Sequence, residues 1–212
     1  MANTSTILSA SLLALVLSAL GTPDSRAETV DRVLAVVGTR VITLSDARAA
    51  IAFGFVRPSP GSDPIAEGRT YLVNRELILT EVERYAAPPP DPALLTIRLD
   101  EVRSRVQGAS QLQAALRDTA MTEERLRDIV SDTIRIEDYL DSRFTAQAQP
   151  TAEEVQRYYR DHSAEFAREG TVPPFEEARP AVHARLTLER RAALIAEWLD
   201  RLQRRTQVLI RN

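Results

Sequence analysis

The feature that most constrains the fold is a pair of short β-branched runs near the N-terminus, with one matching run at the far end of the chain. Residues 33–37 (Val-Leu-Ala-Val-Val) and 41–44 (Val-Ile-Thr-Leu) flank Gly38-Thr39-Arg40, which is typical of a tight β-hairpin. A two-stranded hairpin buries too little apolar surface to be stable alone. Residues 206–210 (Thr-Gln-Val-Leu-Ile) are the other segment of strand-like composition. We therefore expect the last strand to close onto the first hairpin.

Helical patterns fill the interval between these strands, because apolar residues recur there at spacings of three and four. Prolines within residues 87–92 interrupt the helices with a stiff, extended connector. The predicted helices cover residues 45–56, 65–85, 92–106, a short segment capped by Ser110, 122–144, 151–166 and 175–204. The predicted fold class is therefore mainly α: a multi-helix domain with a small β-sheet that joins the N-terminal hairpin to the C-terminal strand.

Two of these helices have faces that we expect to point into the core. The apolar spacing selects one stripe on the helix over residues 65–85 and another on the last helix, where the single tryptophan joins the stripe. The predicted core-facing residues are Tyr71, Ile78, Val82 and Tyr85 on the first of these helices, and Leu188, Ile195, Trp198, Leu199 and Leu202 on the second.

The N-terminal segment has features of a secretory signal. Residues 7–20 form an apolar run that is shorter than the ~20 residues of a membrane-spanning helix. Ser25 and Ala27 place small residues at the −3 and −1 positions of a cleavage site after Ala27, although residues 1–6 contain no basic side chain. We expect a signal peptide over residues 1–27 and an exported protein. The alternative is an uncleaved anchor.

Segments at both ends of the chain carry a resemblance to one family. Residues 30–46 (Val-Asp-Arg-Val-Leu-Ala-Val-Val-Gly-Thr-Arg-Val-Ile-Thr-Leu-Ser-Asp) resemble the opening of the SurA family of periplasmic chaperones. Residues 174–180 (Pro-Phe-Glu-Glu-Ala-Arg-Pro), continued by Glu189-Arg190-Arg191 and Trp198-Leu199, resemble the segment that follows the parvulin isomerase domain of that family. The two matches occur in the family's order.

The chain departs from the family's pattern where the isomerase domain is expected. Residues 150–159 match the pattern Pro-Thr-x-Glu-Glu-Val-x-x-Tyr-Tyr, which leads into that domain in the family. Here only residues 167–173 separate Phe166 from the segment that resembles the post-parvulin region. The resemblance thus implies a SurA-like chaperone domain over residues 28–212, with an N-terminal part at 28–167, a closing helix and strand at 174–212, and no parvulin domain between them.

Composition and motifs argue against several classes of chemistry. The chain has no cysteine, which excludes disulfides and thiolate catalysis, and its two histidines, His162 and His183, lack metal-ligand spacing. Paired glutamates lie in first helical turns, where the helix dipole explains them. A net charge of −3 without basic runs gives no argument for nucleic acid. We expect no catalytic residue, metal, cofactor, nucleic-acid partner or stable membrane span.

The resemblance implies an ATP-independent periplasmic chaperone that binds unfolded or extended polypeptides during outer-membrane protein biogenesis. Such a site is expected to be an exposed apolar groove. The candidate peptide-binding residues lie near loops or helix ends: Phe53, Phe55, Val56, Leu112, Leu116 and Met121. Each of them is equally compatible with an ordinary place in the core.

Two other functions stay open at this point. One is an inactive or degenerate peptidyl-prolyl isomerase homologue. The absence of the parvulin domain argues against isomerase activity, because no other part of the chain remains to build a proline pocket. The other is an adaptor for a single partner in envelope assembly. The adaptor and the chaperone differ in how many partners they bind, because a chaperone binds many unfolded chains and an adaptor binds one folded partner. The sequence does not indicate the oligomeric state.

Overall fold

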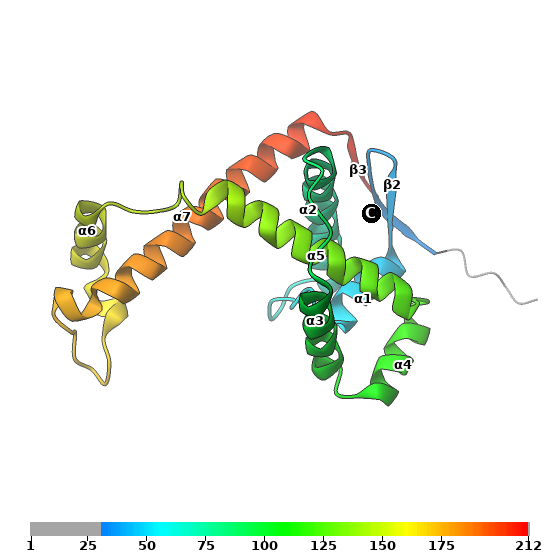
Figure 1. Ribbon diagram of the computed structural model, residues 1–212, viewed down its shortest axis with the longest axis horizontal. Helices are drawn as coiled ribbons and strands as arrows, with labels where there is room; N and C mark the ends of the chain where they lie inside the picture. Colours follow the sequence, from blue (N-terminus) through cyan, green and yellow to red (C-terminus); the bar gives the residue numbers. More distant parts are fainter. Residues whose placement is uncertain (1–30, 212) are drawn as a thin grey trace, which may run out of the picture. The chain divides into compact units, whose positions relative to one another are not determined.

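A computed structural model describes residues 31–211 and shows a mainly helical chain with one small sheet, which confirms the predicted fold class (Figure 1). The signal peptide predicted at residues 1–27 lies outside the described residues. The elements are β1 (Val33–Val37), β2 (Arg40–Thr43), α1 (Leu44–Ala52), α2 (Pro64–Arg84), α3 (Pro92–Arg105), α4 (Ala109–Asp118), α5 (Glu123–Phe144), α6 (Ala152–His162), the 3₁₀ helix η1 (Ser163–Phe166), α7 (Phe175–Arg205) and β3 (Val208–Ile210).

The sheet joins the two ends of the described chain. Its order is β2-β1-β3 and both pairings are antiparallel, so β1 lies between its hairpin partner and the last strand (Figure 1). Gly38 has φ +58° in the hairpin turn, a conformation that favours glycine. The Gly38 N–H donates to the Gln207 carbonyl at 3.0 Å, and the Arg211 N–H donates to the Leu34 carbonyl at 2.9 Å. The predicted closure by the last strand is confirmed.

Three apolar clusters stabilise the helices. The first packs the sheet against α2, α5 and α7, with Trp198 at 5.9 Å from the Tyr139 ring and 5.5 Å from the Phe144 ring between centroids. The second joins α1, α3, α4 and α5 around Phe53. The third packs α6 and η1 against the first half of α7 around Val155 and Val182. The last helix therefore contributes to two separate clusters.

Two predicted core positions are wrong. Tyr85 is the C-cap of α2 and is 76% exposed, although its ring forms a T-shaped contact with the Tyr139 ring. Leu188 is 65% exposed, because it lies on the stretch of α7 between Val182 of the third cluster and Trp198 of the first. The spacing of apolar residues identifies which side of a helix is apolar. Whether another element covers that side at a given turn depends on the rest of the fold.

Polar contacts add to the packing between α6 and α7. Thr151 and Glu154 form the predicted capping box, in which the Thr151 N–H donates to Glu154 at 2.8 Å. Glu154 also forms an ion pair with Arg190 of α7, and this contact lowers the pKa of its carboxyl group from 4.5 to about 2. The Tyr158 hydroxyl donates to Glu189 at 2.8 Å. Residues 167–174 connect η1 to α7, with reciprocal 2.9 Å backbone bonds between Arg168 and Thr171.

Deletion of residues 206–212 is expected to unfold the protein or make it aggregate, because β1 would lose the partner on one edge and the core would lose Val208. Thermal melting monitored by circular dichroism measures the effect. A matched control replaces the exposed side chains, Leu209→Ser with Ile210→Ser, and keeps the backbone ladder. A truncated protein that melts like the intact one would contradict the closing role of β3.

The Glu154–Arg190 ion pair gives a pH-dependent prediction. Since the folded-state pKa of Glu154 is lowered, its contribution to stability is fully present above pH 4.5 and is lost as the pH falls toward about 2. Glu154→Gln should therefore lower the melting temperature at pH 7 and leave it nearly unchanged at pH 2. Glu177→Gln on α7 is the control, because Glu177 is exposed and forms no ion pair within residues 31–211. An equal effect of Glu154→Gln at both pH values would contradict the assignment.

Candidate functional site

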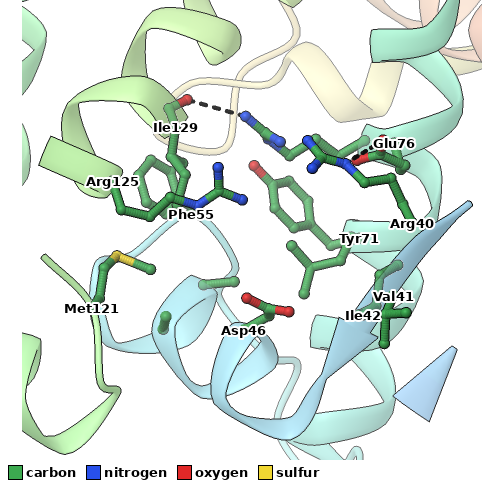
Figure 2. Close-up of a pocket in the computed structure, with 14 residues that line it drawn as sticks. Arg40, Val41, Ile42, Asp46, Phe55, Tyr71, Glu76, Met121, Arg125 and Ile129 are labelled. Atoms are coloured by element: carbon green, nitrogen blue, oxygen red, sulfur yellow. Dashed lines mark hydrogen bonds and ion pairs between the residues drawn. The ribbon is translucent and has the colours of Figure 1, made fainter. Parts of the chain in front are cut away.

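Three adjoining cavities surround the side chains of Phe55 and Tyr71. The small cavity, of about 80 Å³, lies among β2, α1, α2 and the start of α5 (Figure 2), and Arg75 lines both this cavity and the next. The apolar cavity, of about 390 Å³, lies among α2, α3 and α5. The rim cavity, of about 580 Å³, lies between the start of α2 and Val56. Because Phe55 and Tyr71 line all three, we call the combined surface the Phe55 groove.

The end of α1 explains why Phe55 faces the groove. Phe53 is the C-cap of α1 and is completely buried, and Gly54 then adopts φ +69°, which reverses the chain direction. The Phe55 and Val56 N–H groups both donate to the Ala50 carbonyl, at 2.8 and 3.1 Å. Helix α1 therefore ends before the predicted residue 56, and the two phenylalanines point to different environments.

Tyr71 and Arg75 place polar atoms in the wall that the small and apolar cavities share. They lie four residues apart on α2 and therefore share one face of the helix. The Arg75 Nη2 donates to Asp132 at 3.2 Å and to the Ile129 carbonyl at 3.3 Å. Its side chain is only 10% exposed, and its buried Nε has no hydrogen-bond partner within residues 31–211. Burial raises the pKa of the Tyr71 hydroxyl, while the charge of Arg75 opposes this shift.

Charged side chains surround the small cavity. Figure 2 shows Arg125 of α5 and Tyr71 of α2 pointing toward one another across it, with Met121 and Phe55 beside Arg125. Arg125 forms no ion pair with another described residue. On the far side, Arg40 pairs with Glu76 at 3.1 Å. Asp46 also lines the cavity, but its carboxylate accepts from the backbone and side chain of Thr43 at 2.9 and 3.0 Å.

The apolar cavity is lined by aliphatic side chains, two aromatic rings and several polar or charged side chains. At its edge, Arg98 of α3 pairs with Glu137 of α5 at 2.9 Å, and Arg105 donates to the Gly54 carbonyl at 3.1 Å. The apolar lining residues are Phe55, Ile78, Val102, Val130, Ile134, Ile136 and Leu140. This arrangement gives an apolar floor with a polar edge, which suits apolar side chains of a ligand and leaves its polar backbone near water.

The six candidate peptide-binding residues divide into two groups. Phe55 and Met121 line the small cavity, and Phe55 and Val56 line the rim cavity, so these three are brought together. Phe53, Leu112 and Leu116 are buried in the second cluster, so these three are ordinary core residues. The predicted cap of α4 also changes, because its N-cap is Gly108 and not Ser110.

Sequence reasoning missed Tyr71, Arg75 and Arg125 as groove residues. A tyrosine and an arginine four positions apart on an apolar helix face is the one local signal that could have found the first two. Arg125 has no such signal, since only the packing of α5 beside α2 brings it to the small cavity.

The rest of the described chain offers no alternative centre of metal chemistry. Within residues 31–211 there is no cluster of three or more histidine, aspartate or glutamate side chains suited to a metal ion. His162 stacks on Tyr158 at 4.2 Å between centroids, and its Nδ1 lies 3.0 Å from the Tyr158 carbonyl.

None of the helices in the described part of the chain has the length and apolar character that a membrane crossing requires.

Comparison of the chain with models of protein families and with curated protein sequences finds no match.

Proposed function

We propose that this protein is an ATP-independent chaperone that binds extended segments of unfolded polypeptides in the Phe55 groove. The observation that carries the proposal is that the three cavities adjoin one another and share Phe55 and Tyr71. A cavity with an apolar lining and a few polar groups is typical of a binding site.

The dimensions and lining of the groove suit an extended chain. Successive residues of such a chain advance about 3.3 Å and point their side chains to opposite sides. Alternate apolar side chains would enter the apolar cavity, beside Ile78 and Leu140, while the backbone stays near the polar groups at the edge. Because aliphatic walls have little directional preference, such binding tolerates many sequences and needs no nucleotide.

The resemblance of the terminal segments to the SurA family supports the same proposal. That resemblance implies a helical domain closed by its own last strand, and the order β2-β1-β3 agrees with this expectation. The short connection at residues 167–174 agrees with a chaperone domain that lacks the isomerase domain of the family.

Suppression of aggregation tests the proposal. The purified protein, without nucleotide, is mixed with a chemically unfolded outer-membrane β-barrel protein, and light scattering is recorded. We expect dose-dependent suppression near stoichiometric ratios. Phe55→Ser should weaken suppression several-fold, because it removes the aromatic side chain common to all three cavities.

The control variant is Leu188→Ser, which removes an exposed apolar side chain outside the groove. Melting temperatures of both variants show whether they are folded. No suppression by a folded, monodisperse sample would reject the chaperone, and pull-downs that recover one folded partner would then support the adaptor.

We also propose that the protein acts in the periplasm after cleavage behind Ala27. The apolar run and the small residues at the cleavage positions support this location. Cell fractionation with N-terminal sequencing should find a chain that starts at Glu28 outside the cytoplasm. Accumulation of the unprocessed chain in the cytosol would contradict the proposal.

A further inference from the structure

The small cavity has a charge arrangement that an apolar groove does not need. Its walls carry Arg40, Arg75 and Arg125, of which only Arg40 has a carboxylate partner of its own, Glu76. Arg75 shares Asp132 with Arg135, which donates to the other oxygen of that carboxylate at 3.3 Å. One aspartate therefore faces two guanidinium groups.

The charge balance around the cavity leaves an excess of one positive charge. The basic groups are Arg40, Arg75, Arg125 and Arg135, and the acidic groups are Asp46, Glu76 and Asp132. The group without a carboxylate partner is Arg125, whose side chain is exposed, and it lines the cavity together with Arg75, whose side chain is nine-tenths buried. A ligand with a single negative charge would neutralise this excess.

The cavity also holds hydrogen-bond donors that are not in use. In Arg75, only Nη2 donates to described residues, and the buried Nε has no partner there. Arg125 and the Tyr71 hydroxyl likewise make no side-chain hydrogen bond to another residue within 31–211, and Figure 2 shows them converging. Guanidinium groups form strong, directional hydrogen bonds with carboxylates.

We propose that the small cavity binds the C-terminal carboxylate of the polypeptide held in the Phe55 groove. Arg75 and Arg125 provide the positive charge and Tyr71 a hydroxyl donor for the carboxylate, while Phe55 and Met121 contact an apolar terminal side chain. The inference rests on the proposed function, because it takes an unfolded chain as the ligand.

The size of the cavity agrees with a chain end. A volume of about 80 Å³ has space for roughly three water-sized groups, at about 30 Å³ each, which is enough for a carboxylate group. The preceding residues would continue past Phe55 and Tyr71 into the 390 Å³ apolar cavity. A small cavity next to a larger one suits the end of a chain. An internal segment would continue in both directions and would need space on both sides of the small cavity.

Fluorescence anisotropy with two peptides tests the inference. Both probes have the same ten-residue apolar sequence ending in phenylalanine; one has a free C-terminal carboxylate and the other a C-terminal amide. We expect the purified protein to bind the free acid about 10-fold more tightly, the ratio that one charge-assisted hydrogen bond supplies.

Variants assign the preference to the small cavity. Arg125→Gln, which changes an exposed side chain, and Tyr71→Phe, which removes only a hydroxyl group, should each reduce the ratio of the two affinities at least 3-fold. Arg127→Gln on the same helix is the matched control, because Arg127 is exposed and lies outside the cavity. It should keep the wild-type ratio. An equal loss in Arg127→Gln would overturn the assignment to this cavity.

Other outcomes separate this inference from the proposed function. Equal affinity for the acid and the amide, with aggregation still suppressed, would overturn the carboxylate site and leave the chaperone intact. Preference for the acid without suppression would support the site and reject the chaperone. Displacement of the peptide by N-acetylphenylalanine at concentrations near the Kd of the peptide would overturn a chain end as the ligand, because a free small carboxylate would then suffice.

Discussion

The pairing of β1 with β3 is the constraint on which the rest of the described chain depends. Ala35 and Val37 of β1 are buried in the first cluster, whereas Leu209 and Ile210 of β3 are half exposed. The last strand therefore contributes mainly backbone hydrogen bonds and the side chain of Val208. Those hydrogen bonds pair the backbone N–H and C=O groups on one edge of β1, which would otherwise be unpaired. Because the partners lie at opposite ends of the domain, this contact closes a very long loop and belongs to the slow, non-local part of folding.

The pairing of β3 with β1 holds the C-terminal end of α7 beside the sheet, and α7 contributes side chains to two apolar clusters. Its last turns bring Trp198 and Leu202 into the core with the sheet, and its first turns pack Ala178 and Val182 against α6. Leu188, between them, belongs to neither cluster and is exposed. A helix of 31 residues can serve both clusters because each needs only a few of its turns.

Much of the fold could be predicted because its signals are local. The hairpin glycine, the proline-rich connector and the Thr151–Glu154 capping box each act within a few residues, and each lies where the sequence indicated. The groove could be predicted only in part. Phe55 and Met121 were candidates because they lie at helix ends, but the distinction between half-buried Phe55 and buried Phe53 depends on the φ of Gly54 and on the packing of the second cluster around Phe53.

The proposed carboxylate site would also give the groove a direction, which apolar walls alone do not. An extended chain in an aliphatic groove can bind in either orientation and in several registers, because side-chain burial is similar in each. A fixed positive charge at one end breaks this symmetry, since only one orientation brings a terminal carboxylate beside Arg75 and Arg125. If an extended chain binds in the groove as proposed, the same arginines would therefore favour one end of that chain over its middle.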